Sequence, residues 1–499
     1  MSAFPHDDEK PPRVGRGLYV RYLIAAALIV LCTAGTVASA GLIEVNSLVR
    51  IVTQGHAPIP NLKGALDDVT GGGPQTLLVL GSDRRFVDVK ADNPVRSDTM
   101  MLVRLDPNKS ATAVMSIPRD LKVQIPGQGT QKINAAYAAG GPALAVKTVK
   151  NLLHIPISHV VNVNFGGFRR AVDRLKCVFV DVDRKYQHSN AGLAPSQQYA
   201  EINIPAGYQK LCGQKALDYV RYRHEDSDFV RSARQQDFLR QAKAQIGLGR
   251  LFGDRKELLK IFGAYTDTDL NSTPAILRLL KLAFESSSHP IREVQFRGDA
   301  GPEYVTISDA NLKKSVDDFL NVRATGKKQV GRADNAKGKG KTRKVKTSPG
   351  LAPGMVNDRR QAEDYVAKAS ARLSLPLYFA SARLSRGSYV GDGPRVYDIY
   401  DRGHRRHRAY RIVVSAGLFG QYYGVQGTNW KAPPILDDPS ETVKARGRRY
   451  QLYYDGGRLR LVSWKTPRAV YWVSNSLSET LSNKQMLALA RSLITPGSR

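Results

Sequence analysis

Short apolar runs alternate with segments of helical periodicity between residues 75 and 283. The runs are rich in β-branched residues, which is typical of buried strands: TLLVLG, TMMLVRLD, ATAVMSIP, VVNVNF and VFVDVD. Apolar residues recur at helical spacing in the segments 142–153, 166–175, 231–246 and 273–283. This order predicts an α/β domain at residues 74–324, in which a central mixed sheet is covered by helices.

The C-terminal part of the chain has a different pattern. Residues 325–353 lose almost all large apolar side chains and predict a basic, disordered linker. Residues 354–499 then open with the helical segment RRQAEDYVAKASARL and close with another at 483–493. Between them lie strand-like runs such as YRIVVSAG, RYQLYYDG and RLRLVSWK. This order predicts a second, smaller α+β domain.

Residues 18–43 are a candidate membrane helix. Residues 23–40 carry no charge, and at 1.5 Å rise per residue they nearly cross a hydrocarbon core. Arginines on the N-terminal side predict a cytoplasmic tail at 1–17, with a stem at 44–73 and everything after it outside the cell membrane. A cleaved signal peptide is the alternative, because Ala38-Ser39-Ala40 is similar to a cleavage site. The long apolar run favours an uncleaved signal-anchor.

The charge of the chain is strongly positive. It has 75 Lys and Arg against 44 Asp and Glu, a formal net charge of +31. Such a field attracts nucleic acid, anionic lipid headgroups and acidic wall polymers alike. The predicted topology decides between them, because an exported domain does not meet chromosomal DNA. We therefore expect no nucleic acid as partner, and charge alone does not choose between the membrane and wall polymers.

Cys177 and Cys212 form the only cysteine pair in the predicted exported part, since Cys32 lies in the predicted membrane helix. In an oxidising compartment they would form a disulfide that closes a loop of about 35 residues and stabilises the fold by roughly 3 to 4 kcal/mol. Two separate buried thiols are the alternative. No CxxC motif or histidine cluster predicts a zinc site.

Charged residues gather where the predicted strands and helices of the first domain begin or end. The stretches are GSDRR at 81–85, RSDT at 96–99, SIPRD at 116–120 and YVRYRHEDSDFVRSARQQ at 219–236. Each alone is more typical of a cap or a solvated helix face. Together, arginines and two carboxylates are what a pyrophosphate with a divalent cation needs, because guanidinium groups bind phosphate bidentately and Mg²⁺ prefers one or two carboxylates. The chain has no Walker A sequence.

These stretches, with KINAAYAAGG and IPISHVVNVNFGGF, resemble the LytR-CpsA-Psr family, in order, over about residues 74–250. The resemblance implies a Gram-positive cell-wall enzyme of actinobacterial type. Such an enzyme transfers a glycopolymer from a polyprenyl pyrophosphate carrier to peptidoglycan through a phosphodiester. It also implies Mg²⁺ as cofactor, and an apolar tunnel for the lipid, for which the segments 143–153, 165–175 and 238–246 are candidate walls.

The family's roles carry over to matching positions. Asp83 and Asp98 are similar to its magnesium-binding carboxylates, and Asp98 and Arg119 are expected to act in catalysis. The identity of the general base stays open. The pyrophosphate-binding set would be Arg85, Arg96, Arg119, Arg221, Arg223, Arg231 and Gln235.

The sequence leaves two alternative functions open, and it does not decide the role of the aromatic residues in the C-terminal domain. A non-catalytic prenyl-phosphate-binding protein would keep the arginines without needing Asp98. A membrane-tethered regulator would need a cytoplasmic DNA reader, for which residues 1–17 are too few. The C-terminal domain is rich in aromatic residues that could stack on wall polysaccharide or simply fill a core: Tyr422, Tyr423, Trp430, Trp464 and Trp472.

Overall fold

The computed structural model describes residues 47, 49–51, 59, 62, 64–68, 72–82, 97–194, 198–222, 227–246, 253–286, 289–323, 343–344, 351–370, 373–445 and 447–498. Of residues 97, 98, 255, 343, 344, 368 and 370 it describes the backbone only. The predicted tail and anchor at 1–43 lie outside these residues. Within them, no helix combines the length and apolar character needed to span a bilayer.

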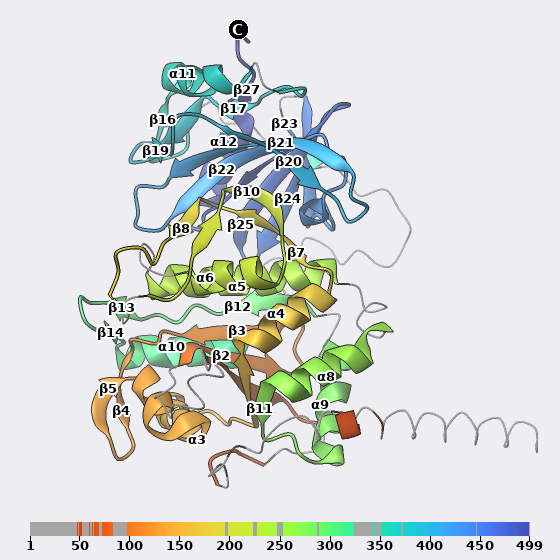
Figure 1. Cartoon of the computed structure of the whole chain (residues 1–499). Helices are drawn as coiled ribbons and strands as arrows, with labels where there is room; N and C mark the ends of the chain where they lie inside the picture. The colour runs from red at the N-terminus through yellow and green to blue at the C-terminus, as the bar shows by residue number, and fades with distance from the viewer. Residues whose placement is uncertain are drawn as a thin grey trace, which may run out of the picture.

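A mixed sheet of six strands forms the centre of the N-terminal unit, which comprises the described residues from 47 to 323 (Figure 1). Its strand order is β11-β6-β1-β2-β3-β12, with β1 antiparallel to β2 and parallel to β6. The prediction of a central mixed sheet is therefore confirmed. The strands are β1 (Gln75–Ser82), β2 (Ser97–Leu105), β3 (Thr112–Ile117), β6 (His159–Asn164), β11 (Thr266–Thr268) and β12 (Ile291–Glu293).

Alternation along β1 divides the sheet into two faces. Leu78 and Leu80 pack in a core with helices α3 (Asn134–Leu153) and α10 (Asp309–Leu320), while Val79 and Gly81 line a cavity on the other face. That second face is covered by α4 (Phe165–Arg174), α5 (Gly213–Arg221) and α6 (Asp228–Gln245). Further elements are β4 (Lys122–Ile125), β5 (Gly129–Lys132), β8 (Tyr186–His188), β9 (Ile202–Ile204), α8 (Arg255–Tyr265), α9 (Thr273–Glu285), β13 (Asp299–Ala300) and β14 (Val305–Thr306).

Helix α3 begins eight residues before the predicted start at 142. Its first part ends at Gly140 and Gly141, whose backbone angles are not helical, and Pro142 opens the second part. Gly141 has a φ of 60°, which glycine adopts at little cost. The sequence predicted only the second part, from residue 142, because two glycines followed by a proline are typical of a helix start.

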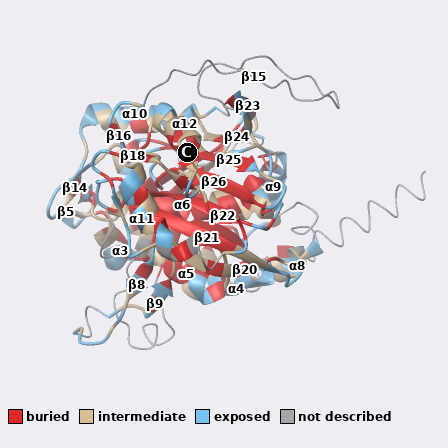
Figure 2. Cartoon of the chain, turned by 90° about the horizontal axis from the view of Figure 1, so that it is seen from above, coloured by how far each residue is buried: buried red, intermediate tan, exposed pale blue. Residues whose placement is uncertain are grey.

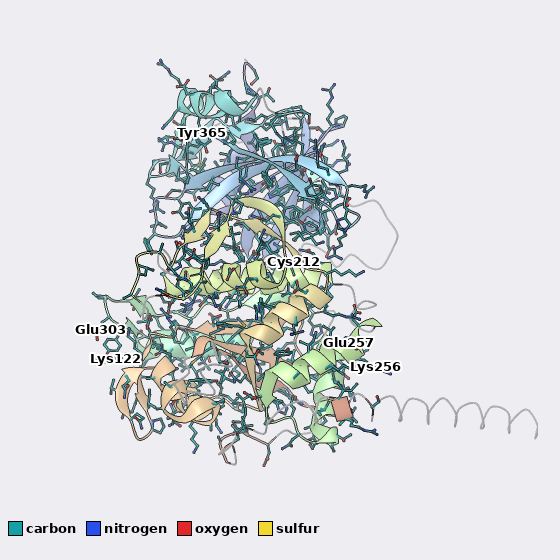
Figure 3. The ribbon with its side chains drawn as sticks, viewed as in Figure 1. Lys122, Cys212, Lys256, Glu257, Glu303 and Tyr365 are labelled. Carbon is teal, nitrogen blue, oxygen red and sulfur yellow. A yellow bond between two sulfur atoms is a disulfide. The ribbon has the colours of Figure 1, made fainter. Side chains whose placement is uncertain are left out.

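Strands β7 (Val178–Val182) and β10 (Gly207–Leu211) form an antiparallel pair above the helices. Cys177 precedes β7 and Cys212 follows β10, and the two form a disulfide with Cα atoms 4.5 Å apart. Figure 3 labels Cys212 beside these strands. The predicted disulfide is confirmed, and the alternative of two separate thiols is wrong.

The C-terminal unit, described residues 343–344 and 351–498, is built on one large sheet. Its strand order is β15-β23-β24-β25-β26-β22-β21-β19, with β20 also paired to β21. Helices α11 (Arg359–Ser370) and α12 (Asn483–Arg491) contribute to the core on one face of the sheet. The sheet strands are β15 (Arg343–Lys344), β19 (Ser388–Tyr389), β20 (Arg395–Tyr400), β21 (Arg406–Ser415), β22 (Tyr422–Thr428), β23 (Glu441–Ala445), β24 (Arg448–Asp455), β25 (Arg458–Lys465) and β26 (Val470–Ser474). Smaller elements are β16 (Met355–Asn357), β17 (Phe379–Ala380), β18 (Ala382–Leu384), the short 3₁₀ helix Pro434–Leu436 and β27 (Leu493–Ile494).

The predicted linker 325–353 lies largely outside the described residues. Within it, Arg343 and Lys344 form β15, which pairs in parallel with β23. The expectation of a fully disordered segment is therefore wrong at these two residues.

The two units share a buried core, and Figure 2 shows the buried residues running through the centre of the molecule. Phe179 of β7 and Tyr208 of β10 pack against the C-terminal sheet, and Gly207 allows a close approach, since a Cβ there would clash with the ring of Tyr397. Asp181 forms a 3.1 Å ion pair with Arg411 of β21 and accepts a 3.0 Å hydrogen bond from the indole of Trp472. The C-terminal unit is therefore packed onto the N-terminal unit rather than tethered at a distance.

This packing decides the role of the C-terminal aromatic residues. Tyr423, Trp430, Trp464 and Trp472 are all buried, so they fill cores and are not available to stack on polysaccharide. Tyr422 is partly exposed, and its ring lies under the guanidinium of Arg184.

Candidate active site

A cavity of about 260 Å³ lies between the central sheet and helices α4, α5 and α6. Its walls are mainly apolar, because the cavity face of β1 and β2 carries Val79 and Met101 and the helices contribute Phe165 and Phe168. The polar side chains of the lining come from β2, β6, α5 and α6: Thr99, Asn164, Arg221, Arg231 and Gln235. A cavity of this kind can hold an amphiphile with an apolar tail and an anionic head.

Arg231 and Arg119 meet at the start of α6. Ser227 caps this helix by accepting a hydrogen bond from the Val230 amide, and Asp228 is its first residue. The Asp228 carboxylate lies 3.0 Å from Arg231 and 3.7 Å from Arg119. Arg119 lies two residues after the end of β3 at Ile117, so the strand places this side chain beside the start of the helix.

Arg221 is held at the end of α5 by stacking and by hydrogen bonds. Its guanidinium lies over the rings of Phe165 and Tyr199 at 5.2 and 5.5 Å, and it donates to the Tyr199 carbonyl. Asp218 lies 3.7 Å away; burial raises the pKa of Asp218, while Gln214 and Arg221 lower it. These contacts fix the direction of Arg221 without filling the cavity.

Gln235 connects α6 to the two elements beside it. Its side-chain amide donates to the Thr99 hydroxyl at 3.1 Å and to the Val220 carbonyl at 3.0 Å. Thr99 directly follows Asp98 in β2. Gln235 therefore sets the distance between the helix with Arg231 and the strand with the predicted catalytic carboxylate.

Arg234 has a different environment from Arg231, although the sequence places both on one helix face. It is fully buried, donates to the Tyr222 carbonyl and lies over the rings of Tyr186 and Tyr222. This residue stabilises the packing of α6 on α5 and does not line the cavity.

Four of the predicted site residues lie outside the described part of the chain: Asp83, Arg85, Arg96 and Arg223. The backbone around them is informative. Ser82 pairs with Ser97 and Gly81 with Thr99, so Asp98 is the extra residue of a β-bulge, and Asp83 follows the paired end of β1. Of the two predicted magnesium ligands, the structure thus places only the backbone of Asp98, beside the end of β1.

Two of the three segments predicted as tunnel walls line this cavity, and the third does not. Phe165 and Phe168 of α4, with Phe238 and Leu239 of α6, line the cavity. The segment 143–153 does not, because its buried residues face the core on the opposite side of the sheet. Helical periodicity alone could not tell which face of the sheet that helix covers.

Comparison with known proteins decides the family. A family model described as the LytR_cpsA_psr family matches residues 52–325, which is more than half of the chain. The chain belongs to this family. The match covers every predicted site residue, and the family resemblance seen in the sequence motifs is confirmed.

Named relatives in the LytR_cpsA_psr family are wall-polymer transferases. The polyisoprenyl-teichoic acid–peptidoglycan teichoic acid transferase TagU of Oceanobacillus iheyensis is 31% identical over 263 residues, which are 51% of this chain and 76% of that protein. TagT of Bacillus subtilis, with the same activity in its name, is 37% identical over 166 residues, 33% of this chain and 50% of TagT. A solved structure of the family protein YwtF (TagT) with bound octaprenyl pyrophosphate lipid covers 53% of this chain and 98% of that one, with 26% identity and a TM-score of 0.38.

Two residues of this family member's site were missed in the sequence. Asp228 lies within the quoted stretch 219–236, three residues before Arg231, and this spacing is the signal that could have revealed the ion pair. Thr99 follows Asp98 and carries no charge, so only the fold shows its contact with Gln235.

Proposed function

We propose that the chain is a phosphotransferase that moves a glycopolymer from a polyprenyl pyrophosphate carrier to a sugar hydroxyl of peptidoglycan. The cavity carries the proposal, since its apolar walls suit a prenyl tail and its polar part suits a pyrophosphate. The activity named for the TagU and TagT relatives supports the same class of donor and acceptor.

The arginines would supply most of the catalytic effect. Phosphoryl transfer requires stabilisation of charge on the transferring group and on the leaving phosphate. Asp228 contacts both Arg119 and Arg231 through one carboxylate oxygen, so their guanidinium groups are oriented before the substrate arrives. Each charge-assisted contact to a phosphate oxygen contributes roughly 1.5 to 3 kcal/mol.

The reaction exchanges one phosphorus–oxygen bond for another. The acceptor hydroxyl of peptidoglycan attacks the phosphate that carries the glycopolymer and loses its proton to a carboxylate. Polyprenyl monophosphate leaves, and the glycopolymer keeps its phosphate as a phosphodiester. Asp98 is our candidate for the carboxylate that receives the proton, because its bulge lies at the edge of the cavity beside Thr99.

The proposal includes magnesium as cofactor. Asp83 and Asp98 would hold Mg²⁺, which neutralises part of the pyrophosphate charge when bound. The family resemblance supports this assignment, together with the backbone position of Asp98 beside the end of β1.

We further propose that residues 18–43 anchor the enzyme in the cell membrane, with the N-terminus in the cytoplasm and the catalytic unit outside. The uncharged run and its flanking arginines support this topology. The Cys177–Cys212 disulfide supports it independently, because such bonds persist in oxidising compartments.

Turnover by the purified full-length chain tests the function. We expect Mg²⁺-dependent coupling of a lipid pyrophosphate-linked saccharide to peptidoglycan oligomers, and we expect Arg231→Ala to abolish it. Arg323→Ala is the matched control, because Arg323 is exposed on the far side of the sheet beyond α10. Tight lipid binding without any coupled product would instead favour a non-catalytic prenyl-phosphate-binding protein.

A further inference from the structure

Helix α9 carries apolar side chains on a buried face and on the exposed face beside it. Ile276 and Leu282 are buried against the rest of the N-terminal unit. Leu277, Leu280 and Phe284 form one stripe at spacing i, i+3 and i+7, and they are 36%, 41% and 58% exposed. Three of the eight exposed large apolar side chains in the described part of the chain thus lie on this one face. Such a patch marks an interaction surface.

Basic side chains border this apolar face. Arg278 and Lys281 of α9 are exposed, and Lys281 lies only at the limit of an ion pair with Glu285, at 4.0 Å. The neighbouring helix α8 adds Lys256, which Figure 3 shows on the outer side of the molecule. Exposed leucines flanked by lysine and arginine are typical of a helix that lies in a membrane interface.

The position of α9 in the chain points to the same partner. Val49 is buried against Leu270 and Ile276, and Figure 1 shows this red N-terminal segment beside α9. The predicted membrane helix ends at residue 43, six residues earlier, so an extended chain places α9 within about 20 Å of the bilayer. No other exposed apolar face in the described residues has this link to the anchor.

Helix α9 is also connected to the substrate cavity. It follows α8 and β11, and α8 packs closely on α4, because a Cβ on Gly167 would lie only 2.5 Å from the Cβ of Tyr265. Arg174 and Asp254 join the same two segments by an ion pair of 2.6 Å. Helix α4 in turn supplies Phe165 and Phe168 to the cavity wall.

We propose that α9 lies in the interfacial layer of an anionic bilayer and holds the cavity beside the membrane, where a prenyl lipid can enter it. Leu277 and Leu280 insert below the headgroups, and Arg278 and Lys281 contact the anionic phosphates. This inference rests on the proposed membrane anchor. It goes beyond that anchor, since a flexible tether alone would leave the catalytic unit free to rotate above the membrane.

A depth-sensitive probe on α9 tests the inference without any catalysis. The full-length chain, with Cys32→Ser to leave no free thiol, is labelled with an environment-sensitive fluorophore at Leu280→Cys and inserted into nanodiscs that contain phosphatidylglycerol. Val390→Cys is the matched control, because Val390 is 38% exposed and lies in the C-terminal unit after β19. Leu277→Cys serves as a second probe if the first variant is unstable.

With the fluorophore at position 280, we expect blue-shifted emission and quenching by brominated lipid acyl chains. With the fluorophore at position 390, we expect neither. Both effects at position 280 should be smaller when phosphatidylcholine replaces phosphatidylglycerol. Equal emission at both positions in a chain that has entered the nanodiscs would overturn the inference. A blue shift that requires high protein concentration and shows no lipid quenching would also overturn the inference, because a second copy of the chain would then cover α9. Failure of the chain to enter nanodiscs would overturn the anchor, and this inference with it.

Discussion

The carboxylate of Asp228 lies 3.0 Å from the guanidinium of Arg231, one turn further along α6. Because the same carboxylate also contacts Arg119, one acidic group orients two proposed phosphate ligands from different elements. Asp228→Asn keeps the shape but removes the charge. We expect it to lower kcat/KM for polymer transfer roughly 10- to 100-fold, since charge-assisted contacts are worth roughly 1.5 to 3 kcal/mol.

Steady-state transfer kinetics check this expectation. Asp318→Asn is the control, because Asp318 forms a similar ion pair with Arg297 on the surface, far from the cavity. A change in kcat/KM that is equally small in both variants would mean that Asp228 does not position the arginines.

Narrowing the cavity should affect the lipid tail more than the pyrophosphate. Leu239 lines the cavity, and Leu239→Trp would fill part of its volume of about 260 Å³. We expect weaker binding of a long-chain prenyl pyrophosphate with little change for isopentenyl pyrophosphate, because burial contributes roughly 0.8 kcal/mol per CH₂ group. Calorimetric titration with both ligands measures the difference. An equal loss of affinity for both ligands would mean that the prenyl tail does not lie in this cavity. Leu351→Trp is the control, because it adds the same indole ring at an exposed position.

The ion pair between Asp181 and Arg411 should be essential for the junction of the two units. Both side chains are almost completely buried, so Arg411→Met would leave an uncompensated carboxylate and lower the free energy of unfolding by about 3 to 5 kcal/mol. Two further nitrogens of Arg411 have no hydrogen-bond partner among the described residues. Adding Asp181→Leu should therefore recover much of the loss.

Urea unfolding measures these differences. Arg408→Met is the control, because its pair with Asp398 is partly exposed and should contribute less than about 1 kcal/mol. If Arg411→Met costs no more than this control, the buried pair does not hold the units together.

Stability should fall as pH rises from about 5 to 8. A cavity between the units is lined by Glu293 and Glu479, and enclosure by protein raises the pKa of Glu293 to about 7 and that of Glu479 in the same direction. The folded state then keeps protons that the unfolded chain loses near pH 4.5, so folding is favoured at low pH and this advantage is lost as pH rises through the folded pKa. Burial alone would raise the pKa of Asp455, but Arg240 and Arg292 hold this pKa below its usual value. The stability that Asp455 contributes is therefore lost only at more acid pH, below this range.

Melting temperatures across this pH range test the sign. We expect the melting temperature of the wild-type chain to decrease with pH, and Glu293→Gln with Glu479→Gln to flatten the dependence. A wild-type melting temperature that rises over the same range would contradict the assignment of these carboxyls.

The sequence predicted the central sheet because β-branched runs are short and regularly spaced, and it marked Arg119 as a candidate site residue because it follows such a run directly. It could not predict the face that α3 covers, since both faces of the sheet bury apolar residues, such as Leu78 on one face and Met101 on the other. Asp228 was missed because a single acidic residue at a helix start is an ordinary cap. Only the fold brings Arg119 to it from another element.

The junction of the two units was beyond sequence reasoning for a related reason. Asp181 lies in a run that reads as an ordinary strand, and Arg411 in another more than two hundred residues later. Nothing local marks their pairing. The buried tryptophans were ambiguous from composition alone, since aromatic residues serve both sugar stacking and core packing.

The central claim is transfer of a phosphate together with the polymer, and the fate of that phosphate tests it most directly. A lipid pyrophosphate-linked saccharide is prepared with ³²P only in the phosphate next to the sugar, and is incubated with the full-length chain, Mg²⁺ and peptidoglycan oligomers. We predict that the label moves to peptidoglycan and that unlabelled polyprenyl monophosphate is released. Label that stays with the lipid while the saccharide is transferred would show glycosyl transfer instead and would contradict the account.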